Sequence, residues 1–174
     1  TEQSKGTKVF SVSGDVARPG VYEVVMGASL RDLVEGLAGA RDIKMVQVGG
    51  ASGRVLPHQL LDAPLAFEAA LGAGAIIVYN TSRDALEIGL RTMEFFAEES
   101  CGKCTPCREG TQVMVETLGR MTQGQGREED LIDMLDLSEV MALASLCGLG
   151  QAAPNCFVDT YQHFGEEYRA RLWK

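Results

Sequence analysis

The sequence has no apolar run long enough to cross a membrane. Its longest apolar stretches are short segments such as AIIVY at 75–79, whereas a transmembrane helix needs roughly 20 residues. The opening residues, TEQSKGTKVF, are polar and lack the apolar core of a secretory signal peptide. We therefore expect no direct membrane insertion. The first residue is Thr and not Met, which indicates a processed chain or a piece of a longer one.

Residue patterns for hydrolytic or phosphoryl chemistry are also missing. The two histidines, His58 and His163, have no Cys, Asp or Glu at a ligand spacing and are interpreted as solvated or internally satisfied. There is no Ser-His-Asp arrangement and no paired-carboxylate motif. The glycines of LGAGA at 71–75 are interpreted as a turn that enters a strand, and not as a nucleotide-binding loop.

Positive charge is scarce. The chain of 174 residues has 16 Lys and Arg against 24 Asp and Glu, a net charge of −8. Such a surface disfavours nucleic-acid phosphates and anionic membranes, so neither is an expected partner. The remaining composition, 45% apolar and 23% charged residues, is typical of a folded globular protein.

Cysteine is too sparse for a disulfide scaffold. The chain has five cysteines, an odd number, and three of them are clustered. Clustered cysteines without a disulfide framework are typical of metal binding in a reducing compartment. We therefore expect a cytoplasmic protein with a metal site.

The first part of the chain predicts a small α+β domain over residues 1–80. KVFSVSG and GVYEVV alternate as strands on either side of a turn at Pro19-Gly20, which indicates a β-hairpin. In SLRDLVEGLAG, Ser29 and Asp32 predict a capped helix that ends at Gly39. Three further short strands follow, MVQVGG, GRVLP and AIIVY, and the whole pattern resembles a β-grasp.

The second part, residues 81–174, has the 3.6-residue periodicity of helices. TSRDALEIGLRTMEFFAEES predicts a first helix capped by Thr81 or Ser82. A second helix is expected to begin at Thr105-Pro106, because proline suits the first helical position. Four or five short helices are expected to form a compact bundle.

Two later segments complete the predicted bundle. DLIDMLDLSEVMALASLCGLG predicts two short helices broken near Leu137-Ser138, because serine suits a helix start. A last helix is expected to begin at Pro154 and to run through Phe157 and Tyr168.

Cys101, Cys104 and Cys107 form a C-x2-C-x2-C motif, followed downstream by Cys147. Structural zinc sites usually take their cysteines as two separated pairs. A tight triplet with a distant fourth cysteine is instead typical of a [4Fe–4S] cluster, in which each thiolate meets a different iron. The motif therefore predicts a [4Fe–4S] site, with zinc as the alternative.

The residues around the triplet suit a cluster. Cys107 is expected in the first turn of a helix, where free N–H groups hydrogen-bond sulfur and favour the reduced cluster. Gly102 lets the loop turn and lets backbone approach the sulfurs. Lys103 and Arg108 are either cations near the cluster or solvated side chains. Glu98 and Glu99 either tune the cluster electrostatically or bind a partner chain, or they end a helix in solvent, which is the favoured interpretation.

The spacing of the cysteines alone does not identify the fourth ligand. Both Cys147, in SLCGLG, and Cys156, in APNCFVD, lie downstream of the triplet. Spacing favours Cys147, which is beside a glycine, whereas a small thiol such as Cys156 is a common core residue.

ESCGKCTPCREG at 99–110 resembles, in full, the iron–sulfur signature of the flavoprotein (NADH-binding) subunit of respiratory complex I and its relatives, the NAD-linked formate dehydrogenases and hydrogenase diaphorases. VSGDVARPGVYEV, VGGASG and LGAGAIIVY are similar to that family's SLBB domain. SLCGLGQAAPN resembles the segment with the fourth cluster ligand. The resemblance therefore implies Cys147 as the fourth ligand and Cys156 as a spare thiol.

The resemblance spans the whole chain but only the C-terminal part of the family's flavoprotein. Loops such as GRGGAGFP and GAGAYICGEE, which hold FMN and NAD(P) in the family, are missing. The implied function is electron transfer from FMN, supplied by a flavin/NADH-binding domain or chain, through this cluster. The implied acceptors are a thioredoxin-like [2Fe–2S] subunit and other iron–sulfur subunits. The alternative is a non-redox, four-cysteine zinc module that binds other proteins.

Overall fold

The computed structural model describes residues 1–69 and 71–173. The chain divides into two compact units, Thr1–Arg83 and Asp84–Lys174. The division falls just beyond the boundary that was expected after residue 80. None of the helices in the described ranges is both long enough and apolar enough to span a membrane.

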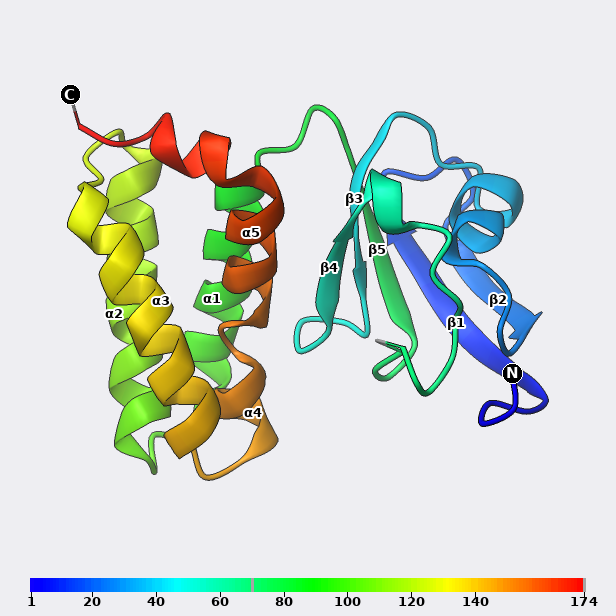
Figure 1. Ribbon diagram of the computed structural model, residues 1–174, viewed down its shortest axis with the longest axis horizontal. Coiled ribbons are helices and arrows are strands. Elements are labelled where there is room, and N and C mark those ends of the chain that lie inside the picture. The colour runs from blue at the N-terminus through cyan, green and yellow to red at the C-terminus, as the bar shows by residue number, and fades with distance from the viewer. Residues whose placement is uncertain (70, 174) are drawn as a thin grey trace. The chain divides into compact units, whose positions relative to one another are not determined.

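The first unit is a five-stranded mixed sheet (Figure 1). Its strands are β1 (Thr7–Gly14), β2 (Gly20–Val25), β3 (Ile43–Val48), β4 (Arg54–Pro57) and β5 (Ala75–Asn80), in the order β2-β1-β5-β3-β4. The central β1–β5 pair is parallel and the other pairs are antiparallel. The predicted hairpin and the three later strands are therefore confirmed, and so is the α+β class.

A short helical segment, η1 (Asp32–Leu37), covers the apolar core of this unit. Phe10 of β1 and Val34 of η1 are completely buried there. Ser29 acts at the helix start as predicted, since its Oγ accepts a hydrogen bond from the Asp32 N–H at 3.1 Å. Gly39 has a φ of +71°, which explains why a glycine ends this segment. The segment winds as a π-helix and not as the regular α-helix that its periodicity suggests.

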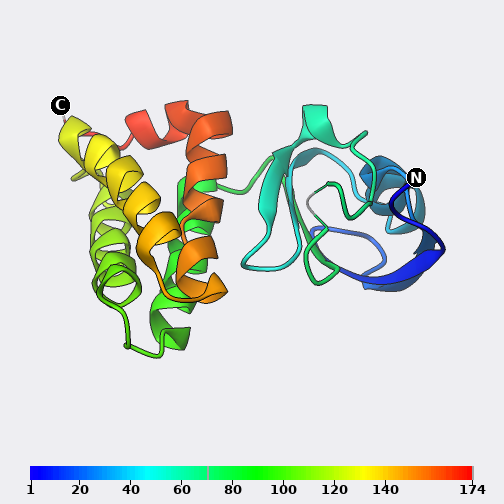
Figure 2. The ribbon, with the colours of Figure 1, turned by 60° about the horizontal axis from the view of Figure 1, so that its bottom comes forward.

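The second unit is a bundle of helices (Figure 1). They are α1 (Ala85–Glu99), α2 (Thr105–Thr122), α3 (Glu128–Ala144), α4 (Gly148–Ala152) and α5 (Asn155–Arg169). The loop between α1 and α2 and the loop between α3 and α4 lie at the same end of the bundle in both Figure 1 and Figure 2. This end therefore receives two segments that are far apart in the sequence.

The cap of α1 differs from the prediction. Asp84 is the N-cap, and its Oδ1 accepts a hydrogen bond from the Glu87 N–H at 3.1 Å. Thr81 and Ser82 precede the helix and are exposed, so the expected Thr or Ser cap was wrong. The second carboxylate oxygen of Asp84 accepts from Arg171 Nη2 at 2.7 Å, which ties the helix start to a residue near the end of the chain.

The α3 helix also differs from the prediction, because it continues through Leu137 and Ser138 without a break. The hydroxyl of Ser138 donates to the carbonyl of Met134 at 2.6 Å, one turn back along the same helix. A serine that bonds inside its own helix does not need to cap a new one. The two short helices expected here are therefore one long helix.

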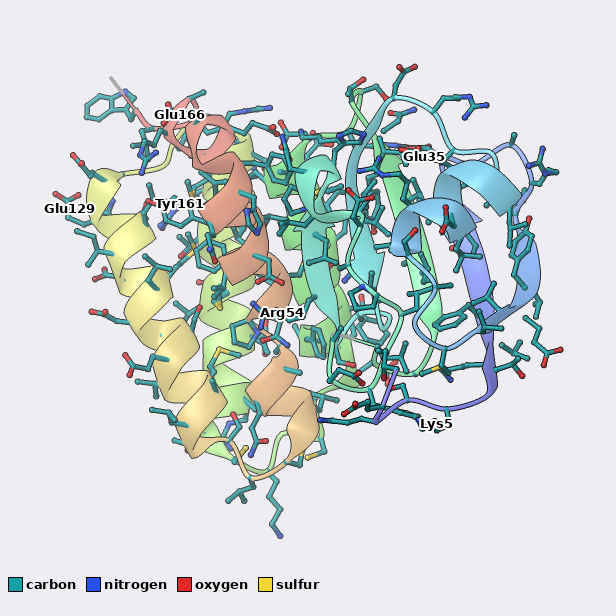
Figure 3. The ribbon with its side chains drawn as sticks, turned by 45° about the vertical axis from the view of Figure 1, so that its right-hand side comes forward. Lys5, Glu35, Arg54, Glu129, Tyr161 and Glu166 are labelled. Atoms are coloured by element: carbon teal, nitrogen blue, oxygen red, sulfur yellow. The ribbon has the colours of Figure 1, made fainter. Side chains whose placement is uncertain are left out.

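The α5 helix is held by a cluster of aromatic rings. Phe157 stacks on Tyr161, which Figure 3 labels, with centroids 5.9 Å apart, and Tyr168 packs edge-on against both rings. The buried Tyr168 hydroxyl lies 2.7 Å from Thr160 Oγ1, so its polar end is satisfied. The last helix begins after Pro154, as expected.

An ion pair at one end of the sheet responds to pH. Asp15, which follows β1, accepts hydrogen bonds from Arg83 Nη2 at 2.6 Å and Arg83 Nε at 2.9 Å. It also accepts the Asn80 backbone N–H at 3.0 Å. The Arg83 hydrogen bonds, aided by the Asn80 N–H, lower the pKa of Asp15 to about 2. The ionised carboxylate therefore fastens the end of β5 to the end of β1.

Because the pKa of Asp15 is lower in the folded chain, this stabilisation is complete above the unfolded pKa of about 4 and disappears as the pH falls through about 2. We expect the first unit to lose about 1–2 kcal/mol of stability over that interval. Asp15→Asn is expected to remove this part of the pH dependence. Amide hydrogen exchange in β1 and β5 between pH 5 and pH 2 measures it, and an unchanged pH profile in Asp15→Asn would contradict the assignment.

Candidate metal centre

The three clustered cysteines lie on the loop between α1 and α2 and on the first turn of α2. Cys101 is exposed on the loop, Cys104 is the N-cap residue of α2, and Cys107 is buried in its first turn. Pro106 occupies the start of the helix, as predicted. Gly102 has a φ of +73°, which a side chain would strain, so the turn between the first two cysteines requires glycine.

Side chains next to the cysteines fix the shape of this loop. Arg108 Nη1 donates to the carbonyl of Gly102 at 2.8 Å, which ties the loop to the helix that follows it. Ser100 Oγ accepts the Gly102 N–H at 3.3 Å and lies 3.3 Å from Cys107 Sγ. Arg108 therefore shapes the loop, whereas Lys103 is exposed.

Cys147 lies on the loop between α3 and α4. It is exposed and is the N-cap residue of α4. The adjacent Leu146 N–H reaches the first loop, where its hydrogen bond is the main reason that the pKa of the Cys104 thiol is lowered. The backbone N–H groups of Cys107 and Cys104 lower that pKa further. The thiolate form of Cys104, which binds metals, is therefore favoured by backbone from both loops.

The two loops also meet through a glycine. A Cβ on Gly150 of α4 would lie 2.8 Å from Cys107 Cβ and 2.6 Å from Ser145 Oγ, so a side chain does not fit there. The Ser145 Oγ is buried and has no hydrogen-bond partner among the described residues. An unpaired buried hydroxyl is costly, and its presence beside Cys107 indicates a site built for an additional group.

Cys156 has a different environment. It lies in the first turn of α5 with 1% of its surface exposed. Burial raises the pKa of its thiol to about 12, although a hydrogen bond with Thr92 acts in the opposite direction. The thiol therefore stays protonated near neutral pH, which is unfavourable for a metal ligand.

The remaining charged candidates are two histidines and two glutamates. His58 Nε2 is 3.6 Å from Glu35 Oε1 in the first unit, and His163 contacts the ring of Phe164. Glu98 and Glu99 are exposed at the end of α1.

Over residues 1–69 and 71–173, no three His, Cys, Asp or Glu side chains are close enough together to hold one metal ion. An iron–sulfur cube needs no such closeness, because its cysteines bind different irons.

Sequence reasoning did not identify three residues of this site: Ser100, Ser145 and Gly150. Ser100 directly precedes the first cysteine, and that adjacency was a usable signal. Ser145 was interpreted as part of a helical run, and nothing in its local pattern indicates an unpaired hydroxyl. Gly150 was assigned no role, because its packing partner Cys107 is far away in the sequence.

Two known families match the chain. The family described as the NADH-ubiquinone oxidoreductase-F iron–sulfur binding region matches residues 87–171. The SLBB domain family matches residues 9–55. The two matches fall on the two units of the structure.

Individual relatives match nearly the whole chain. The HndC protein of the NADP-reducing hydrogenase of Solidesulfovibrio fructosivorans is 37% identical, covering 99% of this chain and 37% of that protein. The F-type component of the NADH-quinone oxidoreductase of Mycobacterium tuberculosis is 36% identical, covering 99% of this chain and 41% of that protein. The chain thus spans about two fifths of the length of these relatives.

A solved structure shares the fold. The crystal structure of an NAD⁺-reducing [NiFe]-hydrogenase in the air-oxidised state contains a chain that is 42% identical, with a TM-score of 0.94. The match covers 99% of this chain and 31% of that chain. The chain therefore carries an SLBB domain followed by the NADH-ubiquinone oxidoreductase-F iron–sulfur binding region, and it matches the C-terminal part of F-type NADH-quinone oxidoreductase components and related hydrogenase proteins.

Proposed function

We propose that this chain binds one [4Fe–4S] cluster through Cys101, Cys104, Cys107 and Cys147 and relays electrons within an NAD(P)-linked flavin and iron–sulfur oxidoreductase. The observation that supports this most strongly is the contact between the two loops. The missing side chain of Gly150 lets α4 pack on Cys107, and the backbone N–H of Leu146 lowers the pKa of the Cys104 thiol. Cys147 follows Leu146 directly, which supports it as the fourth ligand.

The site also suits a negatively charged sulfur cluster chemically. Bound in this way, the cluster supplies storage and release of one electron. The protein contributes four thiolates, the N–H groups at the start of α2, and the backbone N–H of Leu146. These N–H groups stabilise added negative charge, because they place the positive ends of peptide dipoles next to sulfur. No side chain acts as an acid or base.

The larger enzyme supplies the donor and the acceptor. The relatives are named as components of NADH-quinone oxidoreductase and of an NADP-reducing hydrogenase. A flavin/NADH-binding domain or chain delivers electrons from NAD(P)H through FMN, and further iron–sulfur subunits, including a thioredoxin-like [2Fe–2S] subunit, accept them. Cys101 and Cys147 are exposed, and so are the neighbouring Leu143 and Leu146, at 77% and 73%. This apolar surface beside the ligands suits contact with such a partner.

The purified chain, reconstituted without oxygen, is expected to be brown and to contain roughly four iron and four acid-labile sulfide per chain. Reduction by dithionite is expected to produce the paramagnetic signal of a reduced [4Fe–4S] cluster. No flavin is expected to co-purify with this chain alone. A colourless protein with one tetrahedral zinc per chain would overturn the proposal in favour of a zinc module.

Replacing each downstream cysteine identifies the fourth ligand. Cys147→Ser is expected to lose the four-iron cluster or to leave an unstable one, because serine oxygen is a poor ligand for iron in such a cube. Cys156→Ser is the matched control and is expected to retain the full iron content, since its thiol is buried and protonated. Iron and sulfide analysis measures both variants. The opposite result would make Cys156 the ligand.

The packing of α4 on Cys107 is tested by two glycines of the same helix. Gly150→Ala is expected to push α4 away from Cys107, because its new Cβ would approach Ser145 Oγ to 2.6 Å. We expect a loss of about 1–3 kcal/mol in stability and a lower iron content. Gly148→Ala is the control, since nothing lies within 4 Å of its added Cβ. Equal iron content and equal thermal stability in the two variants would contradict this packing.

A further inference from the structure

Ser100 has a hydroxyl whose orientation can be worked out from its partners. Its Oγ accepts the Gly102 N–H at 3.3 Å and lies 3.3 Å from Cys107 Sγ. Cys107 as a cluster ligand is a thiolate, which accepts hydrogen bonds and has no proton to donate. The hydroxyl proton of Ser100 therefore points at the sulfur of Cys107.

Ser145 approaches the same cysteine from the other loop. Its residue is 5% exposed, and its Oγ has no partner among the described residues. The position that a Gly150 Cβ would take lies 2.6 Å from this Oγ and 2.8 Å from Cys107 Cβ, so the hydroxyl and the cysteine side chain both lie against Gly150. Buried hydroxyls are almost always hydrogen-bonded, and a cluster bound at Cys107 would bring sulfur acceptors to this neighbourhood.

We propose that Ser100 and Ser145 are positioning residues that set the reduction potential of the centre by donating hydrogen bonds to its sulfurs. Ser100 donates to Cys107 Sγ, and Ser145 donates to a sulfur of the bound cluster beside Cys107. This inference rests on the proposed function, because it requires the cluster. A hydrogen bond to sulfur stabilises the form with one more negative charge, so each hydroxyl favours the reduced state and raises the potential.

The experiment compares Ser100→Ala and Ser145→Ala with the unchanged chain, all reconstituted and checked for iron and sulfide. The midpoint potential is measured by titrating the paramagnetic signal of the reduced cluster. We expect each variant to have an about tenfold lower ratio of reduced to oxidised cluster at a fixed potential, which for one electron corresponds to a shift of about 59 mV towards negative values. Ser100→Thr keeps the hydroxyl and is expected to restore the potential.

Ser138→Ala is the matched control, because Ser138 is equally buried but donates to the Met134 carbonyl within α3. It is expected to leave the potential unchanged. A role of Ser145 in packing alone predicts a more stable protein on Ser145→Ala, since the unpaired hydroxyl is removed, and no change in potential. An unchanged potential in either alanine variant would overturn the assignment of that serine.

A second measurement compares the unchanged chain with the same two alanine variants. In the unchanged chain, exchange of water for D₂O is expected to shift the iron–sulfur stretching bands seen by resonance Raman spectroscopy, because the serine O–H groups exchange. Ser100→Ala and Ser145→Ala are each expected to reduce that shift, and a shift that persists in full would contradict the proposal. Absence of iron from the unchanged chain would instead overturn the proposed function, so the two failures are distinguishable.

Discussion

The close approach of backbone at Gly150 is the constraint on which the candidate site depends. Only a residue without a side chain lets α4 lie on Cys107, and this contact brings the α3–α4 loop to the start of α2. A similar approach occurs farther along α2, where a Cβ on Gly110 would lie 2.7 Å from Met141 Sδ. Gly150 lets α4 approach α2, and Gly110 lets α2 approach α3. These two glycines therefore set how closely the α1–α2 loop and the α3–α4 loop approach each other.

The site combines exposed and buried cysteines, and this division has a physical reason. Cys107 is buried among packed helices, where hydrogen bonds to sulfur are stronger because water is excluded. Cys101 and Cys147 are at the surface, where a neighbouring protein can come close. For a centre that stores an electron and passes it to another protein, one enclosed side and one solvent-exposed side are an advantage. Cys156 differs from these three, because it is 1% exposed and burial raises the pKa of its thiol to about 12.

Much of this could be predicted from the sequence, because the decisive patterns are local. The alternation in β1 and β2, the helix start at Pro106 and the spacing of the three cysteines all involve residues close in the chain. Two misses arose where distant contacts decide the outcome, because the roles of Gly150 and Ser145 depend on Cys107. The cap of α1 is different, since Asp84 caps through the Glu87 N–H, which is a local contact. The helix break predicted near Ser138 was wrong for another reason. A serine inside a helix and a serine at a helix start cannot be told apart from the local sequence.

The hydrogen bonds that shape the two loops have a consequence for substitutions outside the cysteines. Arg108 of α2 donates to the Gly102 carbonyl at 2.8 Å, and Gln151 Nε2 of α4 donates to the Ser145 carbonyl at 3.0 Å. Each loop is therefore held by a side chain of the helix that follows it. A change at Arg108 or Gln151 alters the loop before it, although neither residue is a cysteine.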